Sequence, residues 1–219
     1  MNTALFIGLV ILVGVGLGWV LHQRTMRRMS PILRRLAAEM NGKVESSNLF
    51  LMPKLRFWYS DTEVEVSSAS TGIAGESRRY TYAKFIGLDF NNFEFRILPR
   101  SFQTIGDKWI GQKKPIPTGV DKLDKRLSIY SNNEPLLKAI LSDRIQADLL
   151  LWAEQKTDNR VSDIRNYDDN LIFAVAGDLE NYEEYKLLLG TACRFFDAVT
   201  KVVSKHSNET NLKRPGSLA

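Results

Sequence analysis

The chain has 219 residues, which is enough for one domain of ordinary size plus a membrane anchor and too few for two large cores. Hydrophobic residues make up 44% and charged residues 25%, a composition typical of globular proteins that excludes a disordered or fibrous chain. The only histidines are His22 and His206, which lie outside the expected folded domain. Ser-His-Asp and Cys-His catalytic sites and the usual zinc sites are therefore excluded from that domain.

The formal net charge is +5, and its position along the chain is informative. Five arginines and no acidic residue lie between residues 22 and 35, so the rest of the chain is balanced. These residues are Arg24, Arg27, Arg28, Arg34 and Arg35. Because a nucleic-acid-binding protein usually carries its positive charge on the folded domain, we expect no nucleic-acid partner.

The N-terminal residues form a long apolar run, TALFIGLVILVGVGLGWVL, over positions 3–21 without charge or proline. As a helix this run would span roughly 28 Å, close to the hydrocarbon thickness of a bilayer. A cleavable signal peptide would need basic residues before the run and small residues at a cleavage site, and the sequence has neither. We therefore predict an uncleaved single-pass transmembrane anchor over residues 1–21.

The charge distribution also predicts the direction of this anchor. The arginines follow the apolar run, in a basic juxtamembrane segment over residues 22–29 and beyond. Since positive residues are retained on the cytoplasmic side, we expect a cell-membrane protein with its N-terminus outside and its soluble domain in the cytoplasm. Arg24, Arg27 and Arg28 either act only as topology determinants or also contact lipid headgroups.

Gly14 and Gly18 form a GxxxG pair inside the apolar run. Small residues at this spacing allow two helix backbones to approach closely, although glycine is common in transmembrane helices in general. The pair is a candidate helix–helix contact, through which the chain could form a homodimer.

The remaining elements are predicted in chain order from hydrophobic periodicity and turn residues. Ser30-Pro31 is expected to begin a helix that ends at Asn41-Gly42, and Asn91-Asn92 is expected to be the turn of a hairpin. Further elements are strands 55–59 and 64–68, strands 80–90 and 93–98, an irregular segment 99–120 with one short strand near Trp109, strand 126–130, two helices over about 135–152, strands 161–165 and 171–176, and a helix over 181–204. Strands joined by hairpins pair antiparallel, and grouped elements predict an α+β fold.

We therefore expect a soluble α+β domain over residues 30–204, in which helices pack on an antiparallel sheet of hairpins and a long C-terminal helix closes the core. That helix would face the sheet with a row of residues at helical spacing: Leu188, Ala192, Phe195, Val199 and Val203. Residues 205–219 are polar and are expected to be a disordered tail.

Several possible active-site motifs are weak in this sequence. Residues 106–113, GDKWIGQK, lack the Gly-Lys-Ser/Thr order of a phosphate-binding loop. The carboxylates Asp158, Asp163, Asp168 and Asp169 fit no calcium loop and are interpreted as turn residues. Cys193, between apolar neighbours, is interpreted as a buried residue rather than a reactive thiol. No metal or cofactor site is predicted.

An aromatic run, Phe57-Trp58-Tyr59, is the candidate partner surface. On a strand, Phe57 and Tyr59 would point to one face and Trp58 to the other, so a ring faces outward unless a helix covers it. The leading hypothesis is a membrane-anchored cytoplasmic domain that acts as a protein-interaction or assembly module. The alternative is an enzyme or small-ligand-binding domain that uses carboxylates and the 106–126 loop, with catalytic residues unknown.

Overall fold

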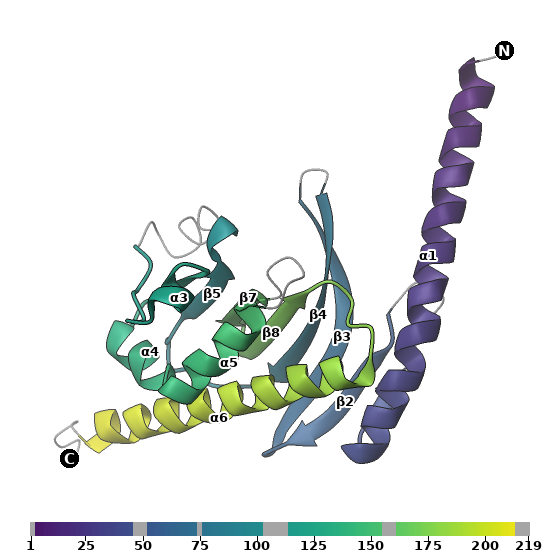
Figure 1. Ribbon diagram of the computed structural model, residues 1–219. Coiled ribbons are helices and arrows are strands. Elements are labelled where there is room, and N and C mark those ends of the chain that lie inside the picture. Colours follow the sequence, from purple (N-terminus) through teal and green to yellow (C-terminus); the bar gives the residue numbers. More distant parts are fainter. Residues whose placement is uncertain (1–2, 46–51, 74–75, 103–113, 155–160, 213–219) are drawn as a thin grey trace, which may run out of the picture.

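The computed structural model describes residues 3–45, 52–73, 76–102, 114–154 and 161–212 (Figure 1). Within these residues, the strands are β1 (Lys43–Glu45), β2 (Lys54–Tyr59), β3 (Thr62–Ile73), β4 (Glu76–Ile86), β5 (Phe95–Pro99), β6 (Leu127–Ser131), β7 (Val161–Tyr167) and β8 (Asn170–Ala176). The helices are α1 (Thr3–Glu39), the 3-10 helix η1 (Arg100–Phe102), α3 (Asp121–Asp124), α4 (Glu134–Ile140), α5 (Asp143–Glu154) and α6 (Tyr182–Leu212). The strands form one antiparallel sheet in the order β1-β2-β3-β4-β8-β7-β5-β6, so the predicted α+β class is confirmed.

Helix α1 runs without a break from Thr3 to Glu39, so the predicted helix start at Ser30-Pro31 is wrong. Pro31 has no N–H to donate to the carbonyl of Arg27. Because both residues are exposed, water can donate a hydrogen bond to that carbonyl, so the helix continues through the proline. No helix formed by the described residues is both long and apolar enough to cross a membrane. The predicted transmembrane helix is thus not confirmed, and for most residues of 3–21, with Gly14 and Gly18 among them, the structure describes the helical backbone but not the surroundings.

Two of the predicted hairpins are present. β2 pairs with β3 around Ser60-Asp61, and β7 pairs with β8 around Asp168-Asp169. In both turns the two central residues have positive φ, as a type I′ hairpin turn requires.

The predicted hairpin around Asn91-Asn92 is wrong. Both asparagines do have positive φ, but β4 pairs with β3 and β8, whereas β5 pairs with β6 and β7. The β7–β8 hairpin lies between β4 and β5, and Leu88 N–H donates to the Asp169 carbonyl at 2.8 Å. The turn at Asn91-Asn92 therefore carries the chain from β4 to β5 past the end of the β7–β8 hairpin.

The core lies between the sheet and the helices α4, α5 and α6, which cover one face of it (Figure 1). The predicted row on α6 is confirmed, since all five of its side chains are buried: Leu188, Ala192, Phe195, Val199 and Val203. The Phe195 ring contacts Phe95 and Phe173, with centroids 5.8 and 6.1 Å away. This helix is thus the lid of the core.

Two segments differ from the prediction near their ends. α6 continues to Leu212 instead of ending near Ser204, and the Ser204 hydroxyl within it donates to the Thr200 carbonyl one turn back. The expected tail over 205–219 thus begins as helix, and residues 213–219 lie outside the described part. The segment 99–120 begins with η1 and is followed by the unpredicted helix α3; the strand expected near Trp109 falls outside the described residues.

Candidate interaction surface

The face of the sheet opposite α4, α5 and α6 is the candidate site, and we call it the outer face. Side chains alternate along β2: Leu55 and Phe57 are buried in the core, whereas Trp58 points outward. The outer positions of the neighbouring strands follow from the register, in which Arg56 lies opposite Glu65 and Trp58 opposite Glu63. Charged and aromatic residues therefore gather on this side.

Glu65 is the centre of an ion-pair cluster on the outer face, although it is only 6% exposed. Its carboxylate accepts hydrogen bonds from Lys54 Nζ at 3.1 Å, Arg56 Nη2 at 3.0 Å and the Tyr82 hydroxyl at 2.8 Å. Arg56 also pairs with Glu63 at 3.0 Å and with Glu45 at 3.3 Å. The cluster links β1, β2, β3 and β4 through their side chains.

The surroundings of Glu65 decide its ionisation. Burial disfavours the carboxylate, but hydrogen bonds from Tyr82 and Lys54 and the charges of Lys54 and Arg56 outweigh burial and lower the pKa of Glu65. Burial and the hydrogen bond to Glu65 raise the pKa of Tyr82, so its hydroxyl stays a donor. The cluster is thus a paired and fixed structure at neutral pH.

A second ion pair lies further along the same face, on β5 and β7. The Arg96 guanidinium donates two hydrogen bonds to the Asp163 carboxylate, at 2.9 and 2.8 Å. Arg165 approaches the same carboxylate at 3.4 Å, and its guanidinium lies 5.5 Å from the centroid of the Tyr167 ring. Asp163 is therefore a structural ion-pair residue rather than a turn residue.

One row across the sheet carries two exposed aromatic side chains. Register places Trp58, Glu63, Ile86, Asn170 and Tyr167 side by side on β2, β3, β4, β8 and β7. Trp58 is 72% exposed and Tyr167 is 56% exposed. We call these five residues the aromatic row. Aromatic side chains are enriched in protein-binding surfaces relative to the rest of a protein's surface.

The two neighbours of Trp58 have structural roles. Phe57 is buried at 4% exposure. Tyr59 is half-buried, its ring packs edge-on against Phe196, and its hydroxyl donates to Asp197 at 2.9 Å. Burial and the hydrogen bond to Asp197 raise the pKa of Tyr59 to about 12. Only Trp58 of the predicted aromatic run is therefore available to a partner.

The other candidate residues lie apart from the outer face. Arg24, Arg27 and Arg28 are exposed on α1. Asp168 and Asp169 form the β7–β8 turn, as predicted, and Asp158 lies outside the described residues. Burial and the charge of Asp197 raise the pKa of the Cys193 thiol to about 12, as expected for a buried cysteine.

A cleft of about 680 Å³ lies between the turns at 89–94 and 166–169. Its lining holds four carboxylates, of Asp89, Glu94, Asp168 and Asp169, and neither lysine nor arginine. Within the described part of the chain, no group of His, Cys, Asp and Glu could hold a metal ion. The cleft does not bring carboxylates and lysines together, and residues 103–113 of the 106–126 loop lie outside the described residues.

Sequence reasoning missed Glu65 and Tyr167 as residues of the outer face. The alternation of KLRFW on β2 and of EVEV on β3 was a usable signal, since opposite charges on adjacent strands pair when they share a face. Tyr167 had no such signal, because three strands separate it from Trp58 in the sheet.

No protein-family model matches the chain, and no curated protein matches it. Among solved structures, it is similar to the mycobacterial trehalose monomycolate transport factor A, TtfA, at 15% identity and a TM-score of 0.40. The similarity covers 80% of this chain and 94% of that one. A likeness at this level supports no argument about function.

Proposed function

We propose that this chain is a single-pass membrane protein whose cytoplasmic domain binds a protein partner through the aromatic row on the outer face. The anchor is supported by the uncharged apolar run over residues 3–21 and by α1, which is helical throughout that run. The orientation is supported by Arg24, Arg27 and Arg28, which are exposed directly after it.

The exposure of Trp58 carries the binding proposal. A tryptophan that is 72% exposed leaves a large apolar surface in water, where burial by a partner is favourable. Its backbone is held by β3, in which Glu63 lies opposite Trp58, while β1 pairs with β2 only from Lys54 to Arg56. A rigid aromatic residue loses little conformational entropy on binding, which suits it as an anchor of an interface.

The charge pattern of the outer face supports a protein partner over a nucleic acid. The cations Lys54 and Arg56 are paired with Glu65, Glu63 and Glu45, and Arg96 with Asp163. Paired cations are poor phosphate ligands because a phosphate would have to displace a carboxylate. The acidic cleft at 89–94 and 166–169 is less well supported as an enzyme site, because its carboxylates have no lysine or arginine beside them in the lining.

Photo-crosslinking in native membranes tests the proposal. A photoreactive phenylalanine analogue would replace Trp58, Tyr167 or, as a control, Leu151, which is 48% exposed on α5. We expect one discrete crosslinked species from positions 58 and 167, identified by mass spectrometry, and none from position 151. If all three positions gave the same products, or if 58 and 167 gave none, the binding proposal would be wrong.

A topology reporter tests the orientation separately. A reporter that is active only in the cytoplasm, fused after Ala219, should be active, and one that is active only outside should be inactive. The opposite pattern would reverse the orientation without affecting the crosslinking result.

A further inference from the structure

Helix α1 is fixed to the domain, and this connection sets which side of the domain faces the anchor. Met29, Leu33 and Leu36 on α1 are buried in the core. The Arg35 guanidinium lies 3.7 Å from the centroid of the Tyr182 ring at the start of α6, and the Tyr182 hydroxyl donates to Glu39. No break in the helix separates these contacts from the apolar run. If residues 3–21 span the bilayer, as proposed above, the domain is therefore held in one orientation beside it.

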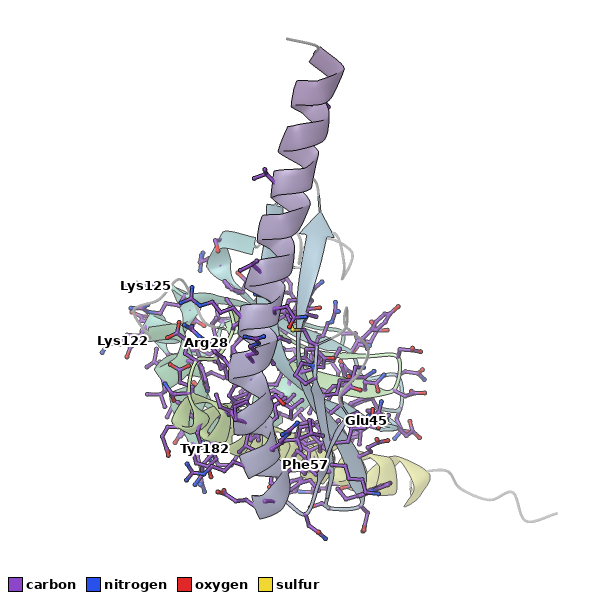
Figure 2. The ribbon with its side chains drawn as sticks, turned by 90° about the vertical axis from the view of Figure 1, so that its right-hand side faces the viewer. Arg28, Glu45, Phe57, Lys122, Lys125 and Tyr182 are labelled. Carbon is purple, nitrogen blue, oxygen red and sulfur yellow. The ribbon has the colours of Figure 1, made fainter. Side chains whose placement is uncertain are left out.

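Helix α3 lies at the opposite end of the sheet from α1 (Figure 1), but it lies toward the N-terminal end of α1 in height. Figure 2 shows Lys122 and Lys125 at the level of Arg28 along α1, whereas Phe57 and Tyr182 lie nearer its C-terminal end. Arg28 is exposed and lies about 10 Å along the helix from the end of the apolar run. Both lysines thus come close to the level at which the lipid headgroups are expected.

The surface around α3 is basic, and we call Arg100, Lys122, Lys125 and Arg126 the basic patch. All four side chains are exposed. The acids of α3 are Asp121 and Asp124, and the Asp124 carboxylate already accepts hydrogen bonds from the N–H and the hydroxyl of Thr118, at 2.9 and 2.8 Å. The four cations of the basic patch therefore outnumber the carboxylates that α3 contributes.

The basic patch has a fixed backbone. Leu123 is fully buried and holds α3 against the core. Arg100 donates from Nη1 to the Asp124 carbonyl at 2.6 Å, and Arg126 donates from Nη1 to the Ala153 carbonyl at 2.9 Å. Lys122 on α3 and Lys125 at its C-terminal cap are then presented close together, next to the 38% exposed Val120.

We propose that the basic patch lies against anionic lipid headgroups of the bilayer that holds the N-terminal anchor. The chain would then touch the membrane at two places, at Arg24, Arg27 and Arg28 beside the anchor and at Lys122 and Lys125 on α3 and its C-terminal cap. This second contact would prevent the domain from tilting and would keep the aromatic row at a constant angle to the membrane. The inference rests on the proposed anchor and adds a lipid-binding surface of the folded domain.

Fluorescence of the full chain in lipid nanodiscs tests this contact. Cys193 would be replaced by alanine, and a polarity-sensitive dye would be attached to a Val120→Cys variant. The nanodiscs would hold phosphatidylcholine alone or with about 30 mol% phosphatidylglycerol, and nitroxide-labelled headgroups would report proximity. We expect quenching of the dye in the anionic discs, weak quenching in the neutral discs, and loss of the difference at about 0.5 M NaCl, where the Debye length is roughly 4 Å.

Charge variants identify the residues responsible. Each basic residue near an anionic surface changes the ratio of docked to undocked domain about five-fold, so Lys122→Gln with Lys125→Gln should lower it about 25-fold. The matched control is Arg144→Gln with Lys201→Gln, which removes the same charge from exposed positions on α5 and α6 and should leave quenching unchanged.

The outcomes separate this inference from the anchor itself. If the chain enters the discs but the dye is quenched equally in both lipid compositions, or the α3 variant behaves like its control, the lipid contact is wrong and the anchor stands. If the chain fails to enter discs of either composition, the anchor and the contact that depends on it are both overturned.

Discussion

The Tyr82 hydroxyl donates to Oε1 of Glu65 at 2.8 Å, and this bond joins the central strand β4 to the ion-pair cluster on β2 and β3. Glu65 is almost fully buried, whereas the side chains of its cationic partners Lys54 and Arg56 remain about one-third exposed, at 35% and 36%. The carboxylate thus depends on these partners for its charge, while the cations also reach water. Removal of Lys54 and Arg56 would leave a buried carboxylate without its cations, whereas removal of the carboxylate would leave cations that water can solvate. Loss of the Glu65 charge should therefore destabilise the fold less than loss of both cations.

The first prediction concerns the pH dependence of this cluster. The pKa of Glu65 is lowered from its ordinary 4.5, so its stabilising effect is present above that pH and is lost as pH falls through the lowered value. Glu65→Gln should reduce the free energy of unfolding by about 1–3 kcal/mol at neutral pH. The difference from the unmodified protein should shrink below pH 4.5, as measured by urea denaturation across pH.

Tyr82→Phe should have a similar but smaller effect, because it removes one of the donors to Glu65. Glu154→Gln, at an exposed position on α5, is the control and should show little change at any pH. A pH-independent loss in Glu65→Gln would contradict the assigned pKa direction.

The second prediction concerns where the folded domain begins. The sequence suggested a boundary at Ser30, but Met29 is 1% exposed and belongs to the core. A fragment of residues 30–212 should therefore be less stable than one of residues 24–212, by about 2–4 kcal/mol for the loss of a buried methionine side chain. Equal urea midpoints for the two fragments would show that Met29 contributes nothing.

The third prediction concerns the thiol of Cys193, whose pKa is raised to about 12 by burial and by the charge of Asp197. Only the thiolate is nucleophilic, so the folded protein should react with iodoacetamide at pH 8 far more slowly than an unfolded chain with a thiol pKa of about 8.5. Labelling measured by mass spectrometry, with and without denaturant, checks this expectation. Rapid labelling of the folded protein would indicate that α6 opens at this point.

The sequence predicted those parts of the fold that local patterns determine. The hairpins at Ser60-Asp61 and Asp168-Asp169 join strands that are neighbours in both sequence and sheet. The buried row on α6 follows the 3.6-residue period, so one amphipathic pattern located its face. The end of α6 was harder to predict, because the polar residues after Ser204 show no apolar period that marks where the helix stops.

The errors arose where pairing is non-local. Asn91-Asn92 has the residues of a hairpin turn and the positive φ values to match, yet its flanking strands pair with β8 and β7. The residue types of a turn indicate that the chain reverses there, but they do not indicate which strands become neighbours in the sheet. The same limit applies to the candidate surface, because Trp58 could be identified from alternation on β2, whereas Tyr167 joins it only through the order of the whole sheet.

The last prediction concerns Phe195, the bulkiest member of the buried row on α6. Its side chain is 1% exposed and packs between Phe95 of β5 and Phe173 of β8, in the middle of a helix where fraying cannot relieve a cavity. Phe195→Ala should reduce the free energy of unfolding by about 3–5 kcal/mol. Lys201→Ala, at an exposed position on the same helix, should change it by no more than about 0.5 kcal/mol. Urea denaturation gives both values, and crosslinking from position 58 under native conditions gives a second readout. If Phe195→Ala left the midpoint unchanged and abolished crosslinking, α6 would be a binding surface rather than the lid of the core.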